Sequence, residues 1–206
     1  MPLNWIDVTP LSFNTLLLLE RAQLSWLPGH APEGEMAIAL RANPAVEWYL
    51  RHKCPDLNKW LDEVMSHSHP ANSERTRQAE IAIMEKLNDW VVYVVDPVIY
   101  DARPFLGWDS NELLSLTDFT GATVIDVGSG TGRLALTVAP IAKTVFAVEP
   151  VGNLRRYIKQ KARAQGLHNV FSADGLITDI PFPDDFADVT MGGHVYGTYP
   201  EREYLE

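Results

Sequence analysis

Two patterns of hydrophobic and polar positions divide the chain near residue 118. Before that point, apolar residues recur every three or four positions, which is the spacing of an amphipathic helix. Helices are expected over residues 10–27, 44–54, 55–67, 72–95 and 110–116. Ser73 is expected to cap the fourth of these helices, and Ser110 or Asn111 the last. Residues 1–118 therefore form an α-helical N-terminal region in this prediction.

After residue 118, short runs of β-branched residues alternate with helical segments. Strands are expected over residues 122–127, 143–149, 168–174 and 186–193, with helices over 133–142 and 153–167. Strands that alternate with helices favour a parallel, buried sheet joined by right-handed crossovers. The fold class of residues 119–206 is therefore α/β.

The charge and composition exclude some classes of protein. Of the 206 residues, 46% are hydrophobic and 21% charged, which is ordinary for a globular protein. The net charge of −10 argues against general nucleic-acid binding, because a phosphate backbone is held by an excess of Lys and Arg. A basic run on the helix over 153–167 is expected to lie on its solvated face. It contains Arg155, Arg156, Lys159, Lys161 and Arg163.

Cysteine use and the N-terminus indicate where the protein works. Cys54 is the only cysteine, so the chain has no internal disulfide and no CxxC metal site, and we expect a buried, inert thiol. No metal site is predicted. The first twenty residues carry no Lys or Arg, and the apolar run over 16–19 is too short for a signal peptide or a membrane span. A cytoplasmic protein without membrane attachment is expected.

The sequence "IDVGSGTGR" places three glycines between the first strand and the next helix. Gly128, Gly130 and Gly132 allow a sharp turn and the close approach of a ligand to the backbone. The dinucleotide fingerprint requires Gly or Ala at the position of Arg133, so it fails here. Asp126 would repel a pyrophosphate, but it can anchor the loop or face an ammonium group. The spacing therefore favours a ligand that carries a cation.

Acidic residues also stand at the ends of the next two strands. Glu149 ends the second strand, where a carboxylate can accept hydrogen bonds from both hydroxyls of a ribose. Asp174 ends the third strand, where it can accept from an exocyclic amine. One acidic residue at each of three neighbouring strand ends describes a site for an adenosine with a cationic tail.

The segments "VIDVGSGTGRLAL", "VFAVEP", "FSADG" and "IPFPDDFADVTMGG" resemble the first four strand segments of class I S-adenosylmethionine-dependent methyltransferases of the small-molecule type. The resemblance covers about residues 120–200 and implies a Rossmann-like sheet with strand order 3-2-1-4. It implies S-adenosyl-L-methionine as cofactor and S-adenosyl-L-homocysteine as product. It assigns the ribose hydroxyls to Glu149 and the adenine edge to Asp174 and Gly175. The methionine moiety would be held by Asp126, Gly128, Ser129, Gly130, Thr131 and Gly132.

The segment "GGHVYGTY" follows the fourth strand, where the family places residues that face the methyl acceptor. His194 is a candidate general base and Tyr196 a candidate for orienting the acceptor. The Asn/Asp-Pro-Pro-Tyr motif of methyltransferases that modify base or amide nitrogens is missing. The resemblance thus implies methyl transfer to an unidentified acceptor, taken here to be a small molecule, with the helical region and residues 100–108 covering the site.

Two other hypotheses remain open at this stage. The family has seven strands and this chain supplies four, which leaves the fourth strand as an open edge. A truncated chain, a partner chain that completes the sheet, or strand exchange between copies in a homo-oligomer would each account for that edge. The protein could then be a non-catalytic S-adenosylmethionine-binding module or a subunit of a methyltransferase complex. A nicotinamide-dependent oxidoreductase shares Glu149 but not the glycine spacing.

Overall fold

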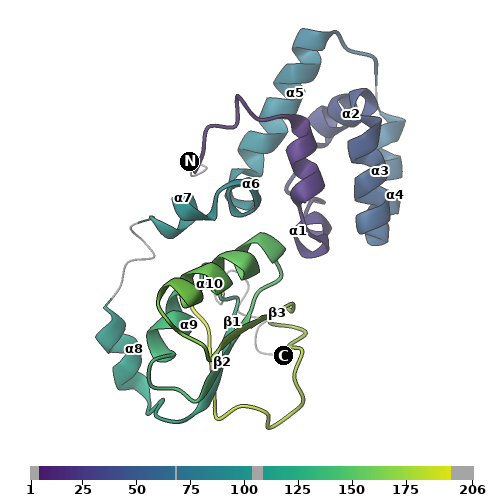
Figure 1. Cartoon of the computed structure of the whole chain (residues 1–206). Coiled ribbons are helices and arrows are strands. Elements are labelled where there is room, and N and C mark those ends of the chain that lie inside the picture. Colours follow the sequence, from purple (N-terminus) through teal and green to yellow (C-terminus); the bar gives the residue numbers. More distant parts are fainter. Residues whose placement is uncertain (1–4, 68, 104–108, 196–206) are drawn as a thin grey trace. The chain divides into compact units, whose positions relative to one another are not determined.

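The computed structural model describes residues 5–67, 69–103 and 109–195. It divides into two compact units, Met1–Tyr100 and Asp101–Glu206. The first unit is helical and the second is α/β, as the hydrophobic patterns predict (Figure 1). The division comes earlier in the chain than residue 118, because helix α8 (Ser110–Leu116) packs on the α/β core through Leu113.

The helical unit consists of short helices packed around aliphatic side chains. They are η1 (Phe13–Leu18), α1 (Arg21–Ser25), α2 (Glu33–Ala42), α3 (Pro44–Lys53), η2 (Pro55–Leu57), α4 (Asn58–Ser66), α5 (Ser73–Lys86), α6 (Asn88–Val95) and α7 (Pro97–Asp101). Helix α2 packs against α4 and α5. Its buried face is formed by Met36, Ala37 and Leu40. The hydrophobic pattern does not predict α2, because Pro32 just before it and Gly34 within it are typical of turns.

Two predicted helices are each divided in the structure. The segment over 10–27 forms η1 and α1, because Glu20 has extended backbone angles and its N–H donates to the side chain of Gln23 in a capping box. The segment over 72–95 forms α5 and α6, which are separated at Leu87. The cap of α5 is Asn72 and not Ser73, since the Asn72 side chain accepts from the Arg75 N–H.

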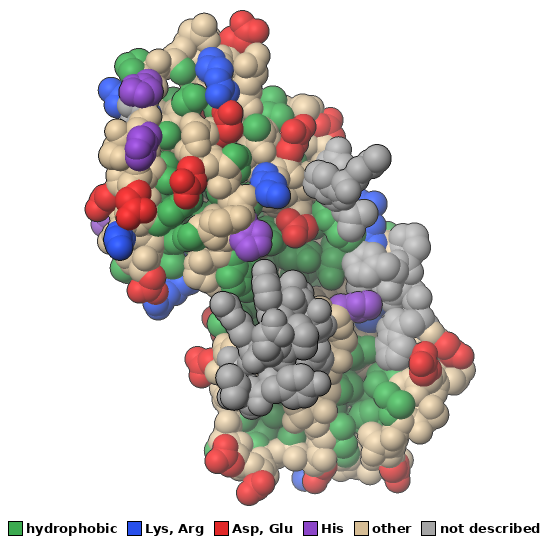
Figure 2. Space-filling view, turned by 180° about the vertical axis from the view of Figure 1, so that it is seen from behind, with side chains coloured by type: hydrophobic (Ala, Val, Ile, Leu, Met, Phe, Trp, Pro, Cys, Tyr) green, Lys and Arg blue, Asp and Glu red, His purple; other side chains and the backbone are tan. Residues whose placement is uncertain are grey.

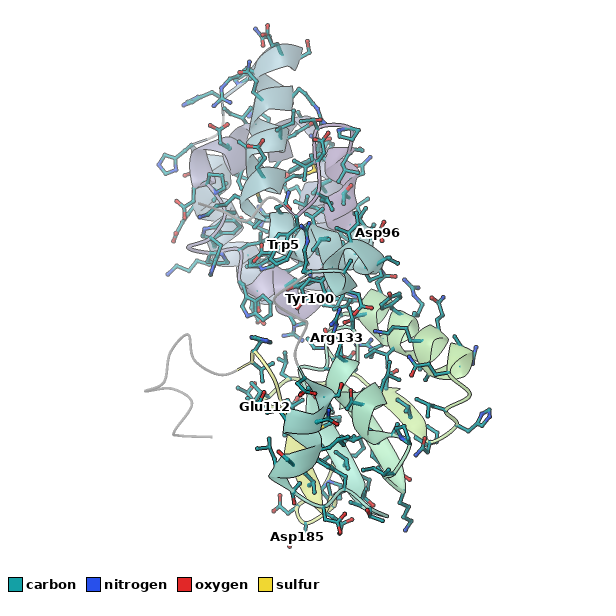
Figure 3. All side chains as sticks on the ribbon, turned by 90° about the vertical axis from the view of Figure 1, so that its left-hand side faces the viewer. Trp5, Asp96, Tyr100, Glu112, Arg133 and Asp185 are labelled. Carbon is teal, nitrogen blue, oxygen red and sulfur yellow. The ribbon has the colours of Figure 1, made fainter. Side chains whose placement is uncertain are left out.

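Asn88, at the start of α6, ties the beginning of the described chain to the helical unit. It is 2% exposed. Its Oδ1 accepts from the Trp5 N–H at 2.7 Å and from the Ile6 N–H at 3.1 Å, and its Nδ2 donates to the Ile6 carbonyl at 2.8 Å. Figure 3 shows Trp5 close to Tyr100. The centroids of their rings lie 5.8 Å apart, in an edge-on contact. One buried amide therefore satisfies three backbone groups far away in sequence.

We expect Asn88→Ala to lower the free energy of unfolding of the helical unit by about 2–3 kcal/mol, because buried backbone groups lose their partners. Chemical denaturation followed by circular dichroism measures the change. Asn58→Ala, at an exposed position that begins α4, is the matched control and should change little. Equal stability of the two variants would contradict the role given to Asn88.

The α/β unit is built on a parallel sheet with the strand order β3-β2-β1-β4, which confirms the predicted order. The strands are β1 (Thr123–Val127), β2 (Thr144–Val148), β3 (Val170–Ala173) and β4 (Val189–Met191), with α9 (Arg133–Val138) and α10 (Gly152–Ala164) between the first three. In the β1–β2 register, Asp126 lies beside Ala147. The ends of β1, β2 and β3 therefore meet at one edge of the sheet.

The two faces of the sheet are covered differently. On one face, α8, α9 and α10 pack on a core that includes Val124, Val145 and Ile158. On the other face, the segment between β3 and β4 contributes Ile177, Ile180 and Phe182 to a smaller cluster. Among the described residues, β4 pairs only with β1. The edge that the sequence predicts as a partner or homo-oligomer surface is thus present, and its use stays a prediction.

Other sequence-based expectations have mixed outcomes. Cys54 is a buried free thiol, as expected. The cap of α8 is Asp109 and not Ser110 or Asn111, because the Asp109 side chain accepts from the Asn111 N–H.

No helix in the described parts of the chain combines the length and apolarity needed to cross a bilayer. On the face drawn in Figure 2, acidic side chains are spread over both units, with Lys and Arg side chains among them.

Candidate cofactor site

The glycine loop adopts backbone angles that favour glycine at all three glycine positions. The angle φ is +63° at Gly128, +54° at Gly130 and +79° at Gly132, in the left-handed region. Gly132 also lacks space, because a Cβ atom there would lie 2.9 Å from Ile158 Cγ1 of α10. The loop therefore needs glycine to turn from β1 into α9 while it packs against α10.

Asp126 places a buried carboxylate directly below this loop. The residue is 1% exposed, and its Oδ2 accepts from the Ala135 N–H in the first turn of α9 at 3.1 Å. Within the described residues, Oδ1 is buried without a hydrogen-bond partner. Buried polar atoms are almost always paired, so an unpaired carboxylate oxygen at a loop of this kind suits a ligand that donates. An ammonium group meets that requirement.

Glu149 follows β2 and binds the same loop. Its Oε2 accepts from the Gly130 N–H at 2.9 Å and its Oε1 from the Val151 N–H at 2.9 Å. The residue is 5% exposed. Because each carboxylate oxygen can accept two hydrogen bonds, the Glu149 side chain keeps further acceptor capacity after both bonds are made. Glu149 therefore both shapes the loop and can bind a hydroxyl-bearing ligand.

Burial strongly affects both carboxyl groups. It raises the pKa of Asp126 to about 7, with the Ala135 N–H bond opposing the shift and the charge of Glu149 adding to it. Burial also raises the pKa of Glu149 to about 7, against the hydrogen bonds from Val151 and Gly130. Desolvation disfavours the charged form of a carboxyl group, and a nearby cation would favour it. A positively charged ligand beside these groups would therefore lower both pKa values.

Asp174 and Gly175 follow β3 at the next strand end. The Asp174 side chain is 73% exposed and forms an ion pair at 3.0 Å with Arg155. Arg155 also donates to the Glu149 carbonyl, so it connects the ends of β2 and β3. A Cβ atom on Gly175 would lie only 2.8 Å from Val148 Cγ1. Because glycine has no Cβ atom, the backbone at this position can lie close to β2. Arg155 is therefore more than the solvated helix residue that the sequence predicts.

The segment after β4 reaches the glycine loop through a residue that the sequence analysis missed. A Cβ atom on Gly128 would collide with Val195, so the Val195 side chain packs directly on the loop. His194 is exposed and has a φ of +61°, unusual for a residue with a side chain. Tyr196 lies outside the described residues. Of the two candidate catalytic residues, the structure therefore places only His194, beside Val195.

Two polar residues of the loop have partners of their own. The Ser129 hydroxyl donates to the Asp126 carbonyl at 2.6 Å. The Thr131 hydroxyl donates to Asp101 at 2.6 Å. Residues 100–108 are predicted to lie close to the site, but no role is predicted for Asp101. Its partners lie 30 or more positions along the chain, so no local pattern marks it.

Residues 124–205 match the family model of the methyltransferase domain. The matched residues lie within the α/β unit, which is therefore similar to methyltransferase domains. The chain is 26% identical over 136 residues to ribosomal RNA small subunit methyltransferase G of Vibrio campbellii, which covers 63% of both proteins. It is 34% identical over 95 residues to demethylmenaquinone methyltransferase of Geobacillus stearothermophilus, which covers 44% of this chain and 40% of the relative.

Among solved structures, a SAM-dependent methyltransferase from Aquifex aeolicus aligns with a TM-score of 0.41 and 25% identity, over 47% of this chain and 56% of that one. The chain spans less than two thirds of the length of the curated relatives that it matches. The residues matched by the family model, 124–205, include the glycine loop.

Proposed function

We propose that this methyltransferase domain binds S-adenosylmethionine and transfers its methyl group to a small-molecule acceptor. The observation that carries the proposal is the unpaired, buried oxygen of Asp126 below a left-handed glycine loop. The cofactor's ammonium group would donate to that oxygen. The backbone of Gly128, Ser129, Gly130, Thr131 and Gly132 would surround the methionine moiety.

The adenosine half of the cofactor fits the neighbouring strand ends. Glu149 would accept the ribose hydroxyls on the lone pairs that its bonds to Gly130 and Val151 leave over. Asp174 and the Gly175 backbone would meet the adenine edge, with Arg155 holding Asp174 in place. In this proposal the three acidic residues bind three different parts of one ligand. This is the division of roles that the sequence predicts for them.

The bound cofactor supplies an already activated sulfonium methyl group. The protein then has to hold an acceptor in line with that group and exclude water. His194 would take a proton from an acceptor that still carries one, and Tyr196 would orient it. Val195 lies on Gly128, so the segment after β4 is next to the loop that would hold the methionine moiety.

Calorimetric titration of the full chain with S-adenosylhomocysteine, with NAD as the control, tests the proposal. Micromolar binding of the first and none of the second is expected. Release of S-adenosylhomocysteine from S-adenosylmethionine in the presence of a small-molecule extract then tests transfer. Binding without any turnover would favour the alternative, a non-catalytic binding module or a subunit that needs a partner. No binding by a folded chain would contradict both.

Binding of the ammonium group should depend on pH. Asp126 has a pKa of about 7 in the ligand-free chain, so a proton must leave before its carboxylate can face the ammonium group. Affinity for S-adenosylhomocysteine should fall about tenfold or more from about pH 8 to about pH 6. Titrations across this range measure it, with proton release read from buffers of different ionisation enthalpy.

The same raised pKa values fix the sign of the stability effect. Protonation favours the folded state of the ligand-free chain, so this contribution is present at low pH and is lost as the pH rises through about 7. The stabilisation by ligand should therefore be larger at about pH 8 than at about pH 6. Asp126→Asn should bind more weakly at high pH and lose most of this dependence. A wild-type affinity independent of pH would show that the Asp126 carboxylate is already charged in the ligand-free chain.

A further inference from the structure

Asp101, the last residue of α7, stands at the centre of a polar cluster on the α/β unit. Its Oδ1 accepts from the Thr131 hydroxyl at 2.6 Å and from Arg133 Nε at 3.1 Å. Its Oδ2 accepts from Lys161 Nζ at 2.8 Å and from the Tyr157 hydroxyl at 3.1 Å. Figure 3 labels Arg133 at the start of α9. One carboxylate thus joins the glycine loop, α9 and α10.

The carboxylate is charged and well enclosed. The Asp101 side chain is 17% exposed, and that of Lys161 is 21% exposed. Burial alone would raise the pKa of Asp101, but the bonds from Lys161 and Thr131 outweigh it and hold the pKa below its ordinary value. Ion pairs that are partly shielded from water and share several hydrogen bonds hold their geometry better than exposed pairs.

The cluster holds Thr131 by two different atoms. Asp101 accepts from its hydroxyl, and Lys161 Nζ donates to its carbonyl oxygen at 3.2 Å. Thr131 is 3% exposed and lies between Gly130 and Gly132. Glycine residues give a loop many accessible backbone conformations. This conformational entropy is lost when a ligand orders the loop, which weakens binding. When Asp101 and Lys161 already hold Thr131, part of this entropy is lost on folding and not on binding of the ligand.

We propose that Asp101 is a positioning residue for the cofactor loop, which together with Lys161 fixes Thr131 so that the loop is ordered before the cofactor binds. The inference rests on the proposed function and adds a residue outside the family-matched region, residues 124–205. Asp101 contacts no ligand in this scheme and acts through Thr131. Its removal should therefore weaken binding even though every ligand-facing group stays in place.

A double-mutant cycle on the full chain tests this scheme. Asp101→Ala and Thr131→Val should each weaken S-adenosylhomocysteine binding about tenfold, and the double variant should be no weaker than about tenfold, because both remove the same bond. Thr131→Ser keeps the hydroxyl and should bind more tightly than Thr131→Val. Asp118→Ala is the matched control in the same unit, since Asp118 accepts from the N–H of its near neighbour Thr120. It should leave the affinity unchanged.

Hydrogen exchange in the ligand-free chain gives a second readout that needs no cofactor. The amides over 128–132 should exchange faster in Asp101→Ala and Thr131→Val than in the wild type, Thr131→Ser or Asp118→Ala. Additive losses of affinity, or unchanged affinity and unchanged exchange, would overturn the inference. If the wild type fails to bind, the proposed function is wrong, and the exchange measurement still decides the role of Asp101. If Asp101→Ala does not fold, the Thr131 pair carries the test.

Discussion

Replacement of Glu149 by alanine should weaken S-adenosylhomocysteine binding by about 1.5–3 kcal/mol, the range for loss of hydrogen bonds to a charged group. The proposed site gives this loss two sources. The ribose would lose its acceptor, and the N–H groups of Gly130 and Val151 would lose the carboxylate to which they donate at 2.9 Å. The loop is therefore disturbed together with the ligand contact. Calorimetric titration at about pH 8, above the raised pKa of Glu149, measures the loss.

Two further variants separate the sources of this loss. Glu149→Gln keeps one acceptor oxygen and nearly the same shape, so it should fall between the wild type and Glu149→Ala. Asp184→Ala removes an exposed carboxylate from the same unit and should leave binding unchanged. Circular dichroism and thermal melts establish that each variant is folded. Wild-type affinity in a folded Glu149→Ala variant would contradict the assignment of this site.

The sheet could be predicted because its signals are local. Runs such as Thr123–Val127 and Thr144–Val148 are apolar and β-branched, and the helices between them have the right length for parallel crossovers. Three glycines with an acidic residue before them mark the loop by composition alone. The positions of Asp126 and Glu149 at strand ends follow from the same pattern. The strand order then comes from the family resemblance, and the structure confirms it.

What the sequence could not predict depends on partners far along the chain. The break between α5 and α6 lies next to Asn88, whose bonds reach Trp5 and Ile6 more than 80 positions away. Asp101 contacts Lys161 across 60 positions, so its role appears only when α10 folds beside the loop. The raised pKa of Asp126 depends on burial, which no single residue encodes. Helix caps fall one residue from the predicted ones, because neighbouring Asn, Ser and Asp residues cap equally well.

Replacement of Gly132 by alanine should destabilise the α/β unit by about 2–5 kcal/mol and abolish measurable cofactor binding. Two costs add at this position. A residue with a Cβ at a φ of +79° costs about 1–2 kcal/mol. The new Cβ would also lie 2.9 Å from Cγ1 of Ile158, a core residue with no exposed surface. Overpacking of this kind costs about 1–3 kcal/mol. If the loop shifts to avoid Ile158, the N–H groups near Gly130 and Thr131 move with it.

Gly121→Ala separates these two costs, because it shares the first and lacks the second. Gly121 has a φ of +70°, and a Cβ there would meet nothing within 4 Å. This variant should lose only the conformational part, about 1–2 kcal/mol, and should bind S-adenosylhomocysteine like the wild type. Denaturation curves and titrations of both variants provide the comparison. Equal losses of stability would mean that Ile158 moves aside freely, and wild-type binding by Gly132→Ala would mean that the loop does not need its contact with α10 to hold the cofactor.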